Sequence, residues 1–517
     1  MAEGSGVWRS LARSFASWRT AAVTLQSFPS GLPLGLVWVA IPAWLALEGV
    51  DIKTIGFVTL TQAPWTFKFL WSPLMDRYAP PFLGRKRGWA VVAQFFLLLG
   101  TLALAWAALD PQRLGFVVVA ALLVAFASAS QDIAIDAYAV EVLHQEEQGV
   151  AAGARGAVNR FAVFLSGRVI ITLAKFVTWP VLFALQALVY IPAAVLMVFS
   201  PEPESVPPPP SSLRAAIWEP FVSFLKQHRA LEIALFLVLY KFADNLASAL
   251  VSPFLIQTGF NEIDVGVAMG TIGLVALMLG TVLGGVVTSA IGLGHSLWIF
   301  GFLQAFSNVG YMLVAQAGVN RPLMYAAMGI ESATQGMGTG AFSVLLLRLT
   351  QKRFSATQYA LLSSIFAIGR TIAGPIAGIV VDATGWWWFF LATIFAAIPG
   401  LVMLQRFAPL GVRDPEFVVE SRPAGGPLRR RELALRALGG IALGATFAAL
   451  ASAALDAMRG LRADPARGFV IADKLEAIVR PSATADWITL AGVLLFGLVC
   501  GLAWAALAAA RRGIRSA

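Results

Sequence analysis

The side chains best placed to do chemistry in this sequence are ionisable residues inside long apolar stretches. A charged side chain at the centre of a membrane helix costs about 2.5 to 3.5 kcal/mol. The whole set would cost on the order of 20 kcal/mol if unpaired, which exceeds the roughly 5 to 15 kcal/mol by which folds are stable. We expect these residues to face one another or a water-filled cavity. They are Lys68, Asp132, Arg160, Lys241, Asp244, Glu331 and Arg370.

One apolar stretch carries polar residues at a regular spacing of four. Ser128, Asp132 and Asp136 share one stripe of a helix, and Gln131 lies beside it. Partial desolvation favours the protonated form of a carboxylic acid. A membrane potential supplies about 2.3 kcal/mol per charge per 100 mV, which can drive protonation-linked turnover. Asp132 is therefore a candidate proton-coupling group.

The same carboxylates have a second, structural interpretation. Asp132 would then form an ion pair with Arg77 or Arg160 and close a gate at the cytoplasmic ends of the helices. Both interpretations stay open for Asp132, whereas we favour the gate for Asp136 and Asp76.

Two further pairs fall at helical spacings. Lys241 and Asp244 are three residues apart and could neutralise each other, or Lys241 and Asn245 could contact a solute. Glu331 and Gln335 are four apart and lie on one face of a helix. Asp244 and Glu331 join Asp132 as proton-coupling candidates.

Histidine and cysteine residues give no sign of a catalytic or metal site. His144, His228 and His295 occur singly, and Cys500 is the single cysteine. No spacing suits a metal, a catalytic triad or an intramolecular disulfide. We expect no metal, no cofactor and no enzymatic activity.

The composition indicates which elements hold these residues. Of 517 residues 58% are hydrophobic and 13% charged, and the mean hydropathy is +0.76, so the bilayer is the expected solvent. The net charge of +10 does not indicate nucleic-acid binding, because the basic residues lie in short loops.

About fourteen apolar segments are long enough to cross a hydrocarbon core of about 30 Å. The expected fold is an all-α polytopic membrane protein. The segments cover approximately 22–47, 54–75, 88–108, 113–137, 150–174, 177–199, 230–257, 264–290, 296–316, 321–347, 356–380, 385–405, 433–455 and 487–510.

The loops between these segments alternate in basic content. Basic residues cluster in one set of loops and occur singly in the other, so the positive-inside rule predicts that both termini face the cytoplasm. The clustered set holds Arg77, Arg85, Lys86, Arg87, Lys226, Arg229, Lys352, Arg353 and Arg429 to Arg431, and the opposite set holds Lys53, Arg113, Lys175 and Arg321.

Proline-rich sequence divides the first twelve segments into two sets of six. Pro201, Pro203 and the run Pro207 to Pro210 can form neither helix nor strand and predict a semi-rigid linker. This 6+6 division suits a major-facilitator architecture, with the solute near the midplane between the halves. The expected divisions are an N-terminal six-helix bundle over 1–199, a cytoplasmic linker over 200–229, a C-terminal six-helix bundle over 230–406, a second cytoplasmic linker over 407–432 and two additional membrane helices over 433–517.

Several motifs carry a resemblance to a known family. Asp76-Arg77 followed by Arg85, Lys86 and Arg87 resembles the major-facilitator loop that latches the cytoplasmic ends, which makes Asp76, Arg77 and Arg85 gate candidates. Further segments resemble the AmpG muropeptide permease family over roughly residues 24 to 405. They are FKFLWSPLMDRY at 67–78, SASQDI at 128–133 with Asp136-Ala137, Tyr240-Lys241 with Asp244, Glu331 with Gly336 to Thr339, and FSATQYALLS at 354–363.

The resemblance implies import of N-acetylglucosaminyl-1,6-anhydro-N-acetylmuramic acid and its peptides across a bacterial inner membrane, driven by the proton gradient. The expected partners are this muropeptide solute, protons and the lipid bilayer, with no obligate protein partner. The alternatives are a transporter of another polar anionic solute such as acetyl-CoA, a membrane enzyme acting on a lipid-linked wall precursor, and a non-transporting sensor. The sequence departs from the family around helix five, where Arg155 and Arg168 accompany the family-like Arg160.

A sugar-peptide presents hydroxyl, amide and carboxylate groups, which call for amide side chains and cations in the protein. A tryptophan can in addition stack on a sugar face. The expected solute-contacting residues are Gln131, Lys68, Arg160, Lys241, Asn245, Gln335, Arg370 and Trp38.

Overall fold

A computed structural model describes residues 12–512 except 15, 51–57, 110–113, 205–207, 227–229, 416–427, 429, 464–469 and 483. The chain divides into two compact units. The first comprises Met1–Ala216 and Glu232–Phe417, and the second comprises Ile217–Leu231 and Val418–Ala517. Lys53, Arg113, Arg229 and Arg429, which contribute to the predicted orientation, lie outside the described residues.

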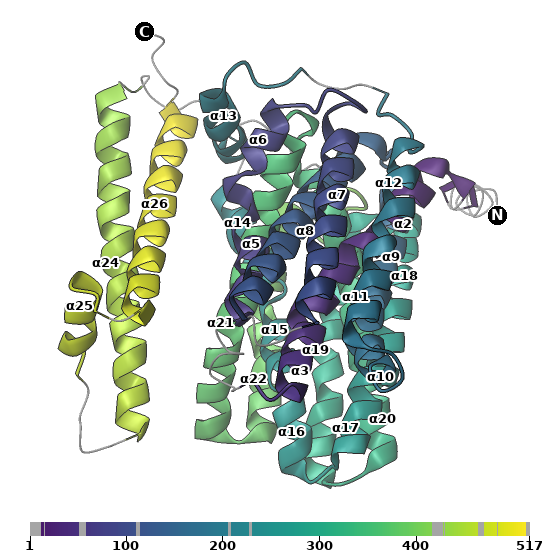
Figure 1. Cartoon of the computed structure of the whole chain (residues 1–517). Helices are drawn as coiled ribbons and strands as arrows, with labels where there is room; N and C mark the ends of the chain where they lie inside the picture. Colours follow the sequence, from purple (N-terminus) through teal and green to yellow (C-terminus); the bar gives the residue numbers. More distant parts are fainter. Residues whose placement is uncertain are drawn as a thin grey trace. The chain divides into compact units, whose positions relative to one another are not determined.

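The first unit opens with a set of helices that ends at Val198, called here the first helix set (Figure 1). Several membrane crossings in it are divided into shorter helical pieces. Their bounds are α2 Trp18–Gly35, η1 Leu36–Ala40 and α3 Ile41–Leu47; η2 Thr59–Gln62, α5 Ala63–Phe67, η3 Lys68–Leu70 and α6 Ser72–Arg77; α7 Arg85–Ala107; α8 Leu114–Val142; α9 Gln148–Phe164, η4 Leu165–Val169 and α10 Ile170–Leu173; α11 Trp179–Leu188 and α12 Tyr190–Val198.

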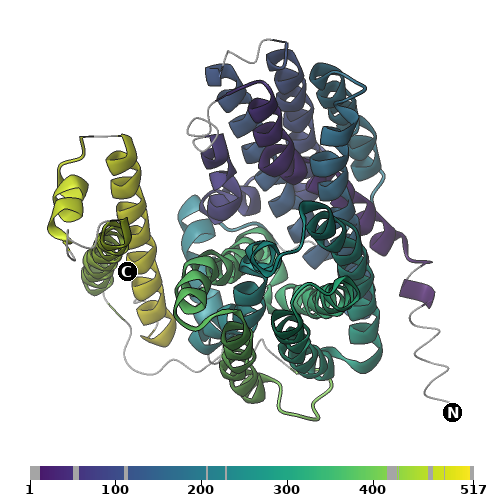
Figure 2. The same cartoon turned by 90° about the horizontal axis from the view of Figure 1, so that it is seen from below.

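The second helix set follows helix α13, Leu213–Leu225, and gathers on the other side of the unit (Figure 2). Its helices run on to Phe407. Their bounds are α14 Ala230–Leu239, α15 Phe242–Ala249 and α16 Val251–Thr258; α17 Glu262–Val267, η5 Ala268–Gly273 and α18 Leu274–Ile291; α19 Leu293–Ala317; α20 Arg321–Leu349; η6 Lys352–Phe354 and α21 Ser355–Thr384; α22 Trp386–Ala396 and α23 Ile398–Phe407.

The predicted all-α membrane fold is confirmed. All the elements of the described residues are helices. Taken singly or joined end to end, they form 12 helical stretches that are long and apolar enough to cross a membrane. Two predicted spans are not among the 12. The segment at 54–75 is broken into short pieces, with Pro64 and Pro73 at the starts of α5 and α6. The segment at 321–347 coincides with the 29-residue helix α20, which polar residues such as Glu331 and Gln335 make less apolar.

Each helix set has its own aromatic core. In the first set Trp44 packs edge-on against Phe183, with ring centroids 5.6 Å apart. In the second set Phe254 packs against Phe390 at 4.8 Å, and Tyr311 packs against the same ring at 5.0 Å. Such aromatic pairs add about 0.5 to 1.5 kcal/mol each beyond the burial of their area.

The two helix sets meet closely where α9 crosses α18. A Cβ atom on Gly153 would lie 2.8 Å from the carbonyl oxygen of Thr281, and one on Gly285 would lie 2.8 Å from the Cα of Gly153. Only glycine permits this approach of the two backbones. The end of the unit at which α6 is followed by α7 is called here the latch end, and it lies at the top of Figure 1. The contact of α9 with α18 lies toward this end.

The second unit contains two long helices, α24 Arg430–Ala463 and α26 Thr484–Arg512, with the short helix α25 Ala472–Val479 between them. Small residues line their contact, where a Cβ on Gly440 would lie 2.8 Å from the Cα of Gly501. Cys500 takes part in the same contact, because a Cβ on Gly444 would lie 2.8 Å from its Sγ. Cys500 is therefore a packing residue.

Candidate functional site

The latch end is built around one buried carboxylate. Asp76, at the end of α6, accepts a hydrogen bond from Lys86 Nζ at 2.5 Å. It also accepts hydrogen bonds from the backbone N and Oγ1 of Thr357 at 2.8 and 2.7 Å and from the backbone N of Ala356 at 3.2 Å. The last two residues lie in the first turn of α21, where backbone N–H groups lack helical partners and an anion is stabilised. Asp76 therefore fastens the first helix set to the second.

A second carboxylate of the latch end, Glu141 on α8, lies beside the first. Its Oε1 accepts a hydrogen bond from Ser355 Oγ at 2.6 Å and lies 3.6 Å from Nη2 of Arg85. Arg85 also donates to the backbone carbonyl of Asp76 at 3.0 Å. The guanidinium of Arg77 lies 5.5 Å from the ring centroid of its neighbour Tyr78. Of the predicted gate residues on this loop, Asp76 and Arg85 thus form contacts that hold the latch end together.

Asp136 lies further into the unit and contacts two cations. It forms an ion pair with Arg155 of α9, and its Oδ2 lies 3.7 Å from Nζ of Lys68 on η3. All three side chains are largely buried. Arg155 also interacts electrostatically with Tyr359 on α21. Asp136 is a predicted gate residue and Lys68 a predicted solute contact. Both belong to one charged cluster with Arg155, and this cluster reaches the second helix set.

Asp132, one turn earlier on α8, contacts neither Arg77 nor Arg160 in this conformation. Its Oδ1 accepts a hydrogen bond from Ser30 Oγ of α2 at 2.5 Å. Gln131 beside it is fully buried, and its amide has no hydrogen-bond partner among the described residues. The ion pairs expected if Asp132 were a gate residue are therefore not formed here.

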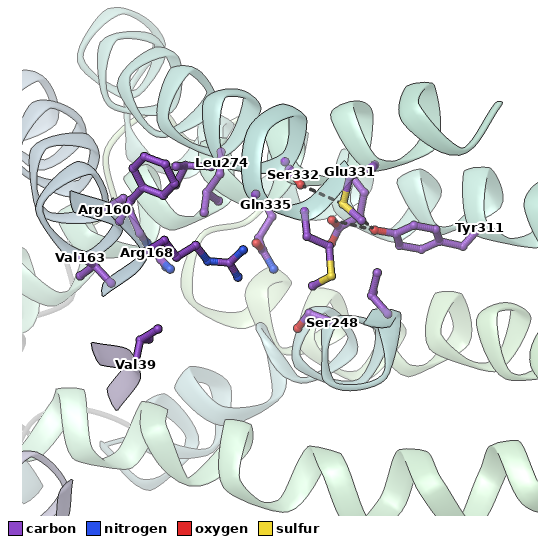
Figure 3. A pocket seen from close by; sticks show the side chains of 17 residues that line it. Val39, Arg160, Val163, Arg168, Ser248, Leu274, Tyr311, Glu331, Ser332 and Gln335 are labelled. Carbon is purple, nitrogen blue, oxygen red and sulfur yellow. Dashed lines mark hydrogen bonds between the residues drawn. The ribbon is translucent and has the colours of Figure 1, made fainter. Parts of the chain in front are cut away.

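A cavity of about 310 Å³ lies between the two helix sets, and charged side chains line both of its walls (Figure 3). Arg160 of α9 and Arg168 of η4 lie on the wall formed by the first set. Glu331 and Gln335 of α20 lie on the wall formed by the second set. Figure 3 shows the guanidinium of Arg168 directed toward the middle of the cavity, with Gln335 and Glu331 beyond it.

Three π-helical segments border this cavity. They are η1, η4 and η5, which supply Val39, Arg168 and the backbone around Gly270 to its lining. A π-turn inserts an extra residue into a helix and re-aims the side chains after it, and such turns occur frequently at functional sites. Their position around one cavity marks it as the candidate binding site.

The acidic residues of the second set are held by neighbouring groups. Glu331 accepts a hydrogen bond from Tyr311 at 3.3 Å. Asp244 lies 3.0 Å from Nζ of Lys241 and accepts a hydrogen bond from Gln335 at 3.3 Å. The ion pair of Lys241 with Asp244, one of the two alternatives for these residues, is therefore formed, and Asp244 also contacts a residue of the cavity wall.

The remaining predicted solute contacts are an amide, an aromatic ring and a cation. The Nδ2 of Asn245 is buried and has no hydrogen-bond partner among the described residues. Arg370 of α21 lies over the ring of Trp38, 5.9 Å from its centroid, and Trp38 packs edge-on against Trp65. Arg370 also interacts electrostatically with Arg160. Trp38 and Arg370 thus lie close to the cavity without lining it.

Comparison with known proteins identifies the family. The model of the Major Facilitator Superfamily matches residues 23–359. The chain belongs to this superfamily. The anhydromuropeptide permease of Escherichia coli (strain K12) is 42% identical over 420 residues, which cover 80% of this major-facilitator chain and 85% of that protein. An uncharacterized protein of Haemophilus influenzae is 34% identical over 396 residues, 74% of this chain and 93% of that one. The predicted resemblance to AmpG-like permeases is confirmed.

Solved structures agree on the fold of this major-facilitator chain. The proton:xylose symporter XylE bound to 6-bromo-6-deoxy-D-glucose has a TM-score of 0.59 at 13% identity and covers 77% of this chain and 98% of its own. FucP in the outward conformation has a TM-score of 0.60 at 12% identity and covers 75% of this chain and 98% of its own.

Sequence reasoning missed several residues of this major-facilitator site. Neither Glu141 nor Tyr311 belongs to a motif that would identify it. Glu141 could still have been found from the sequence, because it is a carboxylate near the end of a helix that lies on the side of the clustered basic loops. Arg168 was noted only as a departure from the family pattern. Its separation of eight residues from Arg160 leaves the two side chains about 80° apart on a regular helix, and the π-turn that reduces this angle has no sequence signature.

Proposed function

We propose that this protein imports anhydromuropeptides, the N-acetylglucosaminyl-1,6-anhydro-N-acetylmuramic acid compounds released from peptidoglycan, across the bacterial inner membrane together with protons. The observation that carries the proposal is the 42% identity over 420 residues with the Escherichia coli anhydromuropeptide permease. The cavity supports it, because two guanidinium groups and an amide face the space where a solute with carboxylate, amide and hydroxyl groups would lie.

We infer the state of the transporter from the contacts at the latch end. In the proposed orientation both termini and the latch end face the cytoplasm, because the latch loop carries the clustered basic residues Arg85 to Arg87. Asp76, Glu141 and the glycine contact of α9 with α18 then close the cytoplasmic side of the cavity. This conformation would receive solute from the periplasm.

Proton coupling is assigned to carboxylates on different elements. Asp132 has no ion-pair partner among the described residues and accepts a hydrogen bond from the Ser30 hydroxyl. Protonation of its carboxylate would therefore not deprive a cation of its partner. Glu331 lies in the cavity wall, and Asp244 contacts that wall through Gln335. Protonation and solute binding would together release the latch, and loss of both on the cytoplasmic side would restore it.

The test is uptake by purified protein in liposomes. A labelled anhydromuropeptide should accumulate inside when the exterior is more acidic than the interior, and it should only equilibrate when the pH gradient is dissipated. Free N-acetylglucosamine serves as the control solute and should not accumulate. Absence of muropeptide uptake by folded protein under both conditions would refute the proposed function, and uptake indifferent to the gradient would refute proton coupling alone.

A reporter fused at Gln351 tests the orientation, since Gln351 precedes η6 at the latch end. It should report a cytoplasmic position. A periplasmic result would place the latch end on the periplasmic side and contradict the proposed orientation.

A further inference from the structure

Two arginines of the cavity form no ion pair within the part of the chain that the structure describes. Arg160 and Arg168 are exposed to the cavity, and neither side chain forms an ion pair or a hydrogen bond with any residue that the structure describes. Arg155 of the same helix, by contrast, is paired with Asp136. Unpaired guanidinium groups inside a membrane protein are costly, so their retention in the cavity wall calls for an anionic ligand.

The π-turn η4 brings the two guanidinium groups onto one face. Eight residues of a regular α-helix correspond to a rotation of about 800°, which would leave Arg160 and Arg168 about 80° apart. The π-helical segment Leu165–Val169 lies between them in sequence and includes Arg168. One extra residue in a turn removes about 100° of rotation, so the two side chains fall within about 20° of one face. They are then two turns apart along the helix and cannot both bind the same small group.

The opposite wall accommodates Arg168. A Cβ atom on Gly270 of η5 would lie 3.1 Å from Nη1 of Arg168. The guanidinium thus reaches across from the first helix set to the backbone of the second. Glu331 on that wall is hydrogen-bonded to Tyr311 and forms no ion pair with Arg168, so the arginine keeps its donors for a ligand.

We propose that Arg160 and Arg168 form a two-point site for two separate carboxylates of one solute, so that the transporter favours muropeptides that carry a peptide over the peptide-free disaccharide. This inference rests on the proposed function and specifies its substrate class. The peptide-free anhydro-disaccharide has one carboxylate, on its lactyl group. A stem peptide converts that group to an amide and supplies several carboxylates of its own. A guanidinium binds a carboxylate through two parallel charge-assisted hydrogen bonds, which a lysine cannot reproduce.

The experiment compares two solutes and three variants in liposomes under one imposed pH gradient. The solutes are the labelled peptide-free disaccharide and its tripeptide form, each supplied well below the concentration that half-saturates uptake. Arg168→Gln should lower tripeptide uptake about tenfold or more and change disaccharide uptake less than about threefold. Arg168→Lys should give an intermediate loss for the tripeptide. Lys175→Gln, which removes an exposed cation seven residues further along, is the matched control and should alter neither uptake.

The outcomes separate the inference from the function on which it rests. Equal loss of both solutes in Arg168→Gln, with folded protein confirmed by size-exclusion chromatography, would overturn the two-carboxylate site and leave muropeptide import standing. Unchanged tripeptide uptake would overturn it as well. Failure of the unmodified protein to transport either solute would refute the proposed function itself.

Discussion

Asp76 illustrates how a single buried carboxylate can hold two halves of a membrane protein together. It is fully buried and is satisfied by Lys86 from its own helix set and by the first turn of α21 from the other. The sequence predicted a gate role for Asp76 from its basic neighbours. It could not predict Thr357 as partner, because the two residues are 281 positions apart and only the tertiary fold brings them together.

The first prediction concerns this contact. Asp76→Ala removes the nearer carboxylate of the buried Lys86 ammonium, which keeps only the Glu141 oxygen at 3.9 Å. Breaking a buried pair costs about 3 to 5 kcal/mol, and the remaining contact offsets part of that cost. The thermal unfolding midpoint in detergent should fall clearly. The double variant Asp76→Ala with Lys86→Met should lose less than the sum of the two single changes, because no charge is then left unpaired. Additive losses would show that the two residues are not energetically coupled.

The second prediction concerns Asp132. Asp132→Asn keeps the size and hydrogen-bonding capacity of the side chain but removes its titration. Gradient-driven accumulation of muropeptide should fail, whereas exchange of internal for external solute should continue, because an amide resembles the protonated acid. Folded protein should be made in normal amounts, since Ser30 can still donate to the amide oxygen. Continued accumulation against a gradient would remove Asp132 from the coupling role and make Glu331 or Asp244 the next candidate.

The helices set the geometry within which these residues act, and the sequence predicted most of them. Apolar length was enough for elements such as α7 and α8, whose predicted and observed ranges overlap along most of their length. Apolar length was not enough for the crossing from Thr59 to Arg77. Pro64 and Pro73 break this crossing into short helical pieces, although the sequence predicted one apolar span over 54–75. The π-helical segments were missed as well, because an extra residue in one turn leaves the apolar pattern almost unchanged.

The third prediction tests the crossing of α9 and α18. Gly285→Ala would place a methyl group 2.8 Å from the Cα of Gly153, a contact that both backbones must move to relieve, at a cost of about 1 to 3 kcal/mol. Closure at the latch end should be disfavoured and uptake should fall severalfold or more. Gly266→Ala, on the same membrane crossing but with no atom within 4 Å of its added Cβ, should transport normally. Equal behaviour of the two variants would contradict a role for this contact in closure.

The fourth prediction concerns residues 408–414, called here the strap, which follow α23 and lie across the start of α19. Gly294 donates its backbone N–H to the carbonyl of Arg413 at 2.8 Å, and Asp414 accepts a hydrogen bond from Arg348 at 2.5 Å. Partial burial acts to raise the pKa of Asp414, but the hydrogen bond and charge of Arg348, the Leu293 N–H and the charge of Arg413 hold that pKa below its ordinary value.

A carboxyl group whose pKa is lower in the folded state than in the unfolded state stabilises the fold. For an aspartate this stabilisation is fully present at pH values above the unfolded-state pKa of about 3.9. It is lost as the pH falls through the pKa of the folded state. Asp414→Asn should therefore lower stability by the same small amount, at most about 1 kcal/mol for so exposed a pair, at pH 5.5 and at pH 8. The two proteins should converge below pH 4. A difference that grows between pH 5.5 and pH 8 would contradict this account.

At the scale of the whole molecule, the chain combines a transporter unit with a separate pair of long helices. The first unit runs to Phe417 and contains the latch, the cavity and the strap. The sequence predicted the division into two six-helix halves and a two-helix appendage, with the second linker beginning at 407. The described residues from 408 to Pro415 group with the first unit, because the strap satisfies backbone groups at the start of α19.

The fifth prediction follows from that boundary. Truncation after Pro415 keeps the strap and should leave muropeptide uptake and its relative preference among muropeptides unchanged. Truncation after Phe407 also removes the hydrogen bonds that Trp298 and Leu293 make to the strap, at 2.8 and 3.3 Å, and should lower the yield of folded protein. A well-folded Phe407 truncation with an altered substrate preference would contradict this and assign the additional helices a part in specificity.

The central claim is that a muropeptide and a proton enter together, and solute-driven proton movement tests it most directly. Liposomes containing the protein and an internal pH indicator are prepared with equal pH on both sides and no membrane potential. Addition of external anhydromuropeptide tripeptide should acidify the interior of liposomes that contain the unmodified protein. It should leave the interior pH unchanged with Asp132→Asn. Muropeptide entry by the unmodified protein without internal acidification would contradict the account.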